Sequence, residues 1–162
     1  MKIIKKYKWL LVCISLALIT VSIFITRFHQ DIRTLTNFSA SYERFDKAIS
    51  DFSEGVLASN AIVETSVIND LERKADIAFV ELKTKATIRI SSLIKNDAEF
   101  MIAELEIEEF SGKELRAVSG YKMAILDQKD MDADKLAKEI SDIKNKRISA
   151  YTRFRELVDL AE

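Results

Sequence analysis

The segment Leu35–Val56, LTNFSASYERFDKAISDFSEGV, carries apolar side chains at intervals that alternate between three and four residues. These side chains are Leu35, Phe38, Tyr42, Phe45, Ile49, Phe52 and Val56. The spacing puts all of them on one face of an α-helix. Four are aromatic, and rings are larger than the Leu, Ile and Val that suit a two-stranded coiled coil. We therefore expect a helix over about 31–57 whose apolar face is either the core of a thicker bundle or a contact surface for a partner protein.

The composition of the whole chain also favours helices. Its 162 residues include no proline and only three glycines, where ordinary usage would give roughly 8 and 11. Because sheets and tight loops need these turn residues, their scarcity predicts long helices with few corners.

Upstream of this segment, residues 9–26 read WLLVCISLALITVSIFIT and contain no charged side chain. Eighteen helical residues are about 27 Å long, close to the hydrocarbon thickness of a bilayer. We expect a transmembrane signal-anchor helix over 9–26. The apolar side chains that would contact lipid include Trp9, Leu10, Leu11, Ile14, Leu18, Ile19, Ile23 and Phe24.

Two other interpretations of residues 9–26 stay open. The basic start of the chain and a candidate cleavage site after Ser22 also fit a secretory signal peptide, although the apolar run continues through Ile25. The third interpretation is the core helix of a soluble protein, which would normally show a polar stripe. The only cysteine, Cys13, lies inside the run, so the chain has no intrachain disulfide.

Charge predicts the orientation of the anchor and limits the partners. The n-region 1–8 holds four lysines, Lys2, Lys5, Lys6 and Lys8. Since few basic residues follow the span, the positive-inside rule predicts a cytoplasmic N-terminus. Residues 28–162 would then form an extracytoplasmic bundle on the inner membrane, in the periplasm of a Gram-negative cell. Residues 28–162 carry a net charge of −6, and a mildly acidic domain is a poor ligand for nucleic acid.

A helix corner is predicted at Ser111–Glu114. Gly112 can adopt a positive φ, and Ser111 and Glu114 match the S-x-x-E capping box of a new helix. The corner would join a helix over about 61–110, with Met101 and Leu105 on its apolar face, to helices over about 113–129 and 132–161. The expected fold class is all-α: an N-terminal transmembrane helix followed by an elongated antiparallel bundle of three or four helices.

Candidate catalytic and metal-binding residues are few. His29 is the single histidine, which makes a Cys–His or Ser–His–Asp site improbable. The acidic run Asp130–Asp134 resembles the start of a calcium loop, but the glycine and glutamate that such a loop needs are replaced by Lys135 and Ser141. The cluster Glu104, Glu106, Glu108 and Glu109 is more typical of a solvated face than of a metal site. We expect no enzyme activity, no cofactor and no metal.

These features favour a single-pass, membrane-anchored scaffold that presents its helical bundle to a protein partner or to a second copy of the chain. The alternative is a signal-sensing or ligand-binding module. The layout resembles the input domains of bacterial chemoreceptors, in which the first span runs directly into the first helix of a four-helix bundle. The resemblance is architectural, and with one predicted span it implies that a sensed signal passes to a partner.

Overall fold

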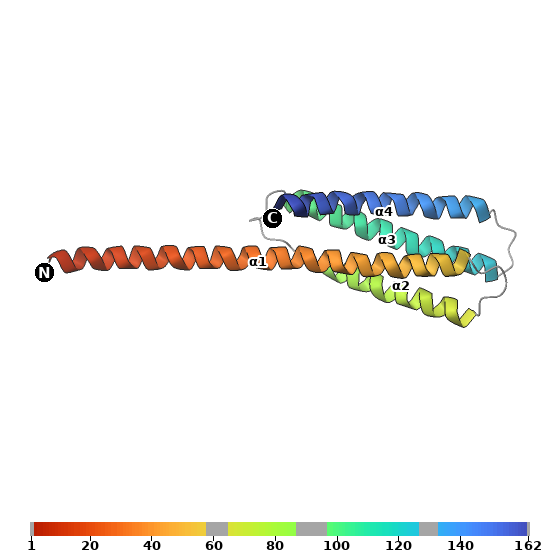
Figure 1. Ribbon diagram of the computed structural model, residues 1–162, viewed down its shortest axis with the longest axis horizontal. Helices are drawn as coiled ribbons and strands as arrows, with labels where there is room; N and C mark the ends of the chain where they lie inside the picture. Colours follow the sequence, from red (N-terminus) through yellow and green to blue (C-terminus); the bar gives the residue numbers. More distant parts are fainter. Residues whose placement is uncertain (1, 58–64, 87–96, 127–132, 162) are drawn as a thin grey trace.

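The computed structural model describes residues 2–57, 65–86, 97–126 and 133–161, and all of them are helical. The helices are α1 (Lys2–Leu57), α2 (Thr65–Ala86), α3 (Asp97–Leu126) and α4 (Ala133–Ala161). Successive helices run in opposite directions and form a four-helix bundle, and the N-terminal part of α1 projects alone from one end (Figure 1). The predicted all-α fold is confirmed for these residues.

Helix α1 is 56 residues long, which corresponds to about 84 Å. It passes from the apolar run into the bundle without a break, as expected from a sequence that has no glycine or proline before Gly55. Side chains 7–27 are exposed on every side of the helix, and the first buried side chain is that of Asp31. One helix therefore has two environments, a lone apolar half and a packed half.

The packed half of α1 buries its apolar face in the core of the bundle. The exposed fraction is at most 3% for each of Leu35, Phe38, Tyr42, Phe45, Ile49, Phe52 and Val56. The ring of Phe38 lies 4.9 Å from that of Phe154 in α4, and the ring of Phe45 lies 5.8 Å from that of Phe79 in α2, between centroids. Within the bundle, this face therefore packs against the other helices and is not a free surface.

Helix α1 packs differently on α2 and on α4. Towards α2 it presents two small residues seven positions apart, Ala48 and Gly55. A Cβ atom on Gly55 would lie only 2.7 Å from Cδ1 of Leu71, so the glycine permits a close approach. The backbones of α1 and α2 and those of α3 and α4 lie closest together, whereas α1 and α4 meet through long side chains.

The predicted corner at Ser111–Glu114 is wrong. Helix α3 continues through these residues, and the side chains of Ser111 and Glu114 are buried in the bundle. A Cβ atom on Gly112 would lie 3.0 Å from Cζ of Phe79, so this glycine makes room for a ring of α2 and does not turn the chain. An S-x-x-E pattern also occurs inside helices, where residues three apart share a face.

The single helix predicted over 61–110 is also wrong, since this part of the chain contributes to two helices, α2 and α3. Helix α3 buries Phe100, Ala103 and Ile107, whereas Met101 and Leu105, expected on the apolar face, are exposed. Of the helix predicted over 113–129, residues 113–126 form the second half of α3 and the rest lies outside the described residues; α4 corresponds to the helix predicted over 132–161. The first three residues of the acidic run Asp130–Asp134 lie outside the described residues.

Candidate functional site

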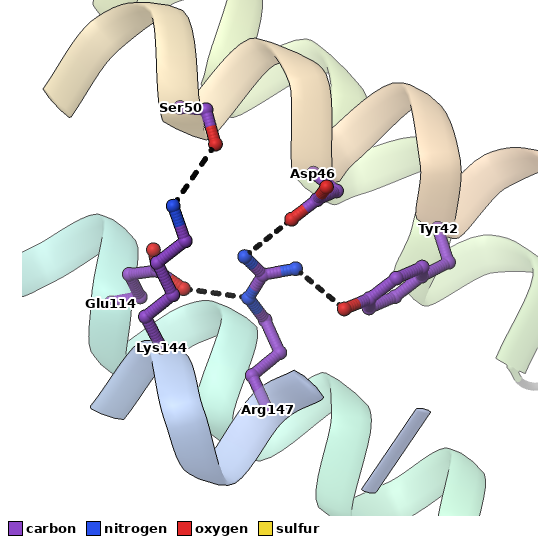
Figure 2. A network of polar contacts seen from close by, with 6 residues as sticks. All are labelled: Tyr42, Asp46, Ser50, Glu114, Lys144 and Arg147. Carbon is purple, nitrogen blue, oxygen red and sulfur yellow. Dashed lines mark hydrogen bonds and ion pairs between the residues drawn. The ribbon is translucent and has the colours of Figure 1, made fainter. Parts of the chain in front are cut away.

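A buried arginine links three helices in the middle of the bundle (Figure 2). The side chain of Arg147, in α4, is fully buried. Its Nε donates to Oε2 of Glu114 in α3 at 2.6 Å, and its Nη2 donates to Oδ1 of Asp46 in α1 at 2.7 Å. Its Nη1 donates to the hydroxyl oxygen of Tyr42, also in α1, at 2.8 Å. Three different nitrogens of one guanidinium therefore hold α4 to α1 and α3.

Aromatic rings flank the guanidinium of Arg147. Its Cζ lies 5.2 Å from the ring centroid of Tyr42 and 5.4 Å from that of Phe45, within the range of cation–π attraction. Glu114 is 1% exposed, whereas the side chain of Asp46 is 44% exposed. This cluster therefore contains one buried cation and one fully buried carboxylate, and its second carboxylate lies at the edge, where water screens it.

The protonation states in this cluster are fixed by burial and by the ion pair. Burial raises the pKa of Tyr42 well above its usual range, so the phenol stays neutral. Burial raises the pKa of Glu114, and the charge of Arg147 opposes that rise. Burial alone would lower the pKa of Arg147, but Glu114 and Tyr42 raise it above its ordinary value. The arrangement is a fixed ion pair that sets how the helices align.

Polar contacts continue along the α1–α4 interface on both sides of Arg147. The hydroxyls of Ser39 and Tyr151 lie 2.6 Å apart, and the ring of Tyr151 stacks on that of Tyr42 with 3.6 Å between centroids. Further from the apolar half of α1, Nζ of Lys144 donates to Oγ of Ser50 at 3.4 Å (Figure 2). The contacts of α1 with α4 are therefore largely polar and aromatic.

A second buried carboxyl group lies on α3, ten residues before Glu114. Glu104 is 4% exposed, and its Oε1 has no hydrogen-bond partner. Burial raises the pKa of this carboxyl to about 8. The expectation of a solvated acidic face is therefore wrong for Glu104. The other three acids of the cluster form ion pairs: Glu106 with Arg153, Glu108 with Lys83 and Glu109 with Lys113.

Sequence reasoning missed the roles of Arg147, Glu104 and Glu114. A usable signal was the heptad spacing of α3, in which core positions are occupied by Phe100, Glu104, Ile107, Ser111, Glu114 and Val118. Three of these six are polar. In α4 the same spacing puts Arg147 between Ile140 and Phe154, both of them buried. Charged residues at core positions of a heptad thus indicate buried polar contacts.

The predicted anchor residues lie in the lone half of α1. The side chains of Trp9, Leu10, Leu11, Ile14, Leu18, Ile19, Ile23 and Phe24 are all exposed. Among the described residues, α1 is the one helix long and apolar enough to cross a membrane; its best 18-residue window has a mean hydropathy of 2.5 and is not buried. Of the topology lysines, Lys8 is exposed, and Lys2, Lys5 and Lys6 belong to the first turns of α1.

The other candidate residues do not assemble into a site. His29 and Cys13 are exposed on the lone half of α1 or at its edge. Within the described ranges, no three His, Cys, Asp or Glu side chains come together as metal ligands would. No protein-family model, curated protein or solved structure matches the chain.

Proposed function

We propose that this chain is a single-pass, membrane-anchored scaffold whose helical bundle contacts a protein partner outside the cytoplasm. The observation that carries the proposal is the lone half of α1, in which residues 7–27 project from the bundle with every side chain exposed. Removing one large apolar side chain from water lowers the free energy by about 1.5–3 kcal/mol. A segment that exposes so many apolar side chains is therefore stable only in an apolar environment.

A bilayer suits this segment better than a protein groove does. Apolar side chains surround the helix on all sides, whereas a helix in a groove keeps one polar face. Both threonines of the segment bond to the backbone of their own helix. Oγ1 of Thr20 donates to the carbonyl oxygen of Leu16 at 2.8 Å, and Oγ1 of Thr26 donates to that of Ser22 at 2.9 Å. Such bonds within the helix are what lipid requires, because it offers no partners.

The bundle has features suited to holding a shape and presenting a surface. The Arg147 cluster joins α1, α3 and α4 through three hydrogen bonds, which favours one fixed alignment of these helices. On the outer surface of α2, Ile77 and Val80 are more than half exposed. Exposed apolar side chains of this kind support contact with a protein partner or with a second copy of the chain.

A sensing module is the second candidate, favoured by a groove between α3 and α4. Its volume is about 460 Å³, and its lining includes Phe110, Lys146 and Arg153. This size falls within the range of small-molecule sites; Lys146 offers a cation for an anionic ligand, whereas Arg153 is paired with Glu106, which also lines the groove. Because α1 is unbroken, a change in bundle packing would reach the membrane through it. A ligand-dependent change in the melting temperature of the full chain would favour this candidate.

The anchor is tested by placing charge in the middle of the apolar segment. Leu18→Arg should greatly reduce retention of the full chain in alkaline-washed membranes, since arginine at the centre of a span costs about 2.5–3.5 kcal/mol. Ile77→Arg, at a similarly exposed apolar position of α2, is the matched control and should be retained like the wild type. Loss of the wild-type protein in the wash would contradict the anchor.

The partner is tested by crosslinking in intact membranes. A photo-crosslinking residue at Val80, which is exposed, should capture a discrete protein, and the same residue at the buried Ala78 should not. A labelled band that contains only the chain itself would identify a homo-oligomer. Equal capture at both positions, or none at Val80, would argue against α2 as the presented surface.

A further inference from the structure

Four exposed apolar side chains lie at the end of the bundle from which α1 projects. Met101, Ile102 and Leu105 belong to the first turns of α3, and Leu160 belongs to the last turn of α4; their exposed fractions range from 48% to 80%. The start of α3 and the end of α4 lie at this same end (Figure 1). We call these four residues the near-end surface.

The unbroken course of α1 determines how far this surface lies from the apolar segment. The segment ends at Thr26, and Leu35 is the first fully buried apolar residue of α1. The nine residue steps from Thr26 to Leu35 span about 13 Å at 1.5 Å per residue. The polar layer of a bilayer is about 5–7 Å thick on each side. With an upright span, the first fully buried apolar layer of the bundle would therefore lie about 6–8 Å beyond the headgroup layer.

A tilt of the span towards the side of α3 and α4 would lower the near-end surface to this layer. Single spans are tilted by about 20° on average. Because α1 has no break between the apolar segment and the bundle, the whole bundle tilts with it. One side of the near end is then lowered towards the lipid. The exposed Arg27 and Arg33 lie on α1 between the two parts, where their charges suit the phosphates of the headgroups.

We propose that the near-end surface rests on the headgroup layer of the bilayer that α1 spans. The proposal depends on the proposed membrane anchor and adds a second contact with the same lipid. The other end of α3 provides an internal comparison. Met123 is 54% exposed, close to the 56% of Met101, but it lies about 33 Å further along the helix axis. The chemistry of the two methionines is the same, and their distance from the bilayer differs.

The proposal is tested with the full chain in phosphatidylcholine–phosphatidylglycerol vesicles. In a Cys13→Ser background, single cysteines replace Ile19, Met101 or Met123 and carry an environment-sensitive fluorophore. Lipids with a nitroxide near the headgroup serve as quenchers for the labels at the two methionine positions, and lipids with a deep nitroxide serve for Ile19. We expect a loss of fluorescence at positions 19 and 101 and none at position 123.

The outcomes separate this proposal from the anchor on which it depends. A quenched label at position 19 with an unquenched label at position 101 overturns the lipid contact alone. An unquenched label at position 19 overturns the anchor and the lipid contact together. Blue-shifted emission at position 101 that lipid does not quench, and that fades as protein is diluted among vesicles, would assign the surface to a second copy of the chain and overturn the lipid contact.

Discussion

Glu104 and Glu114 lie ten residues apart on α3, both are buried, and burial raises the pKa of both. They differ in what surrounds them. Glu114 accepts a hydrogen bond from the guanidinium of Arg147, whereas Oε1 of Glu104 has no partner. The charge of Glu114 is compensated by a cation, whereas Glu104 avoids a charge by keeping its proton. One helix therefore shows both ways in which a protein can avoid a bare negative charge in its core.

The two solutions have different consequences for the bundle. An arginine that binds three side chains on two other helices restricts how α4 can slide or rotate against α1 and α3. A protonated carboxyl imposes no such restriction, and its neutrality depends on pH. The ion pair of Arg147 with Glu114 should therefore determine how the helices align. Glu104 should make the stability of the bundle depend on pH.

The largest effect is expected from Arg147→Ala. The substitution leaves Glu114 buried without its cation, and breaking a buried pair in this way costs about 3–5 kcal/mol. Chemical unfolding of the full chain in detergent, followed by circular dichroism, measures the loss. Adding Glu114→Gln to this variant should recover part of the stability, because the uncompensated carboxylate is removed. An unchanged unfolding midpoint for Arg147→Ala would show that the cluster does not hold the helices.

A pH-dependent loss of stability is expected from Glu104. Its pKa is about 8 in the folded protein and about 4.3 in an unfolded chain. Between these values the folded state binds one more proton than the unfolded state, so stability falls as pH rises and levels off above the folded pKa. The slope is at most about 1.4 kcal/mol per pH unit for one group.

Glu104→Gln isolates this contribution, because glutamine does not titrate. The difference in unfolding free energy between the wild type and this variant should change with pH across the window from about 4.3 to about 8, in favour of the variant at high pH. Titration of Glu114 and of the exposed acids contributes to both proteins and cancels. A difference that does not vary with pH would show that Glu104 is ionised in the folded bundle.

A smaller effect is expected from Tyr42→Phe. The ring stays, but Nη1 of Arg147 loses its acceptor, and an unsatisfied buried donor costs about 1–3 kcal/mol. Tyr151→Phe is the matched control, since its hydroxyl bonds to the neutral Ser39 at a half-buried position. Thermal melts should show a larger shift for Tyr42→Phe than for Tyr151→Phe. The reverse order would mean that Asp46 and Glu114 alone satisfy the guanidinium.

The features of the fold and of the site that can be predicted from the sequence are those that depend on residues close together in the chain. The apolar face of Leu35–Val56 was found because its spacing alone determines which side chains share a helix face. The corner at Ser111–Glu114 was predicted wrongly because a capping box looks the same as two residues one turn apart inside a helix. Residues 111–114 stay inside the helix because of contacts with other segments. Phe79 packs against Gly112, and Arg147 binds Glu114. No local sequence pattern describes such contacts.

The smallest effect, and one of opposite sign, is expected at Ser111. Its hydroxyl is buried on the same helix as Glu104 and likewise has no partner. Ser111→Ala removes a desolvated polar group and introduces the better helix former, so it should stabilise the bundle by about 0.5 kcal/mol. Ser39→Ala is the matched control in α1, because it loses the hydrogen bond to Tyr151 and should be neutral or destabilising.

Paired thermal melts of the full chain compare the two serines. A gain at Ser111 with no gain at Ser39 would show that pairing decides the contribution of a polar group in this bundle. A loss at Ser111 would mean that its hydroxyl has a partner after all, and the contrast between paired and unpaired groups on α3 would then rest on Glu104 alone.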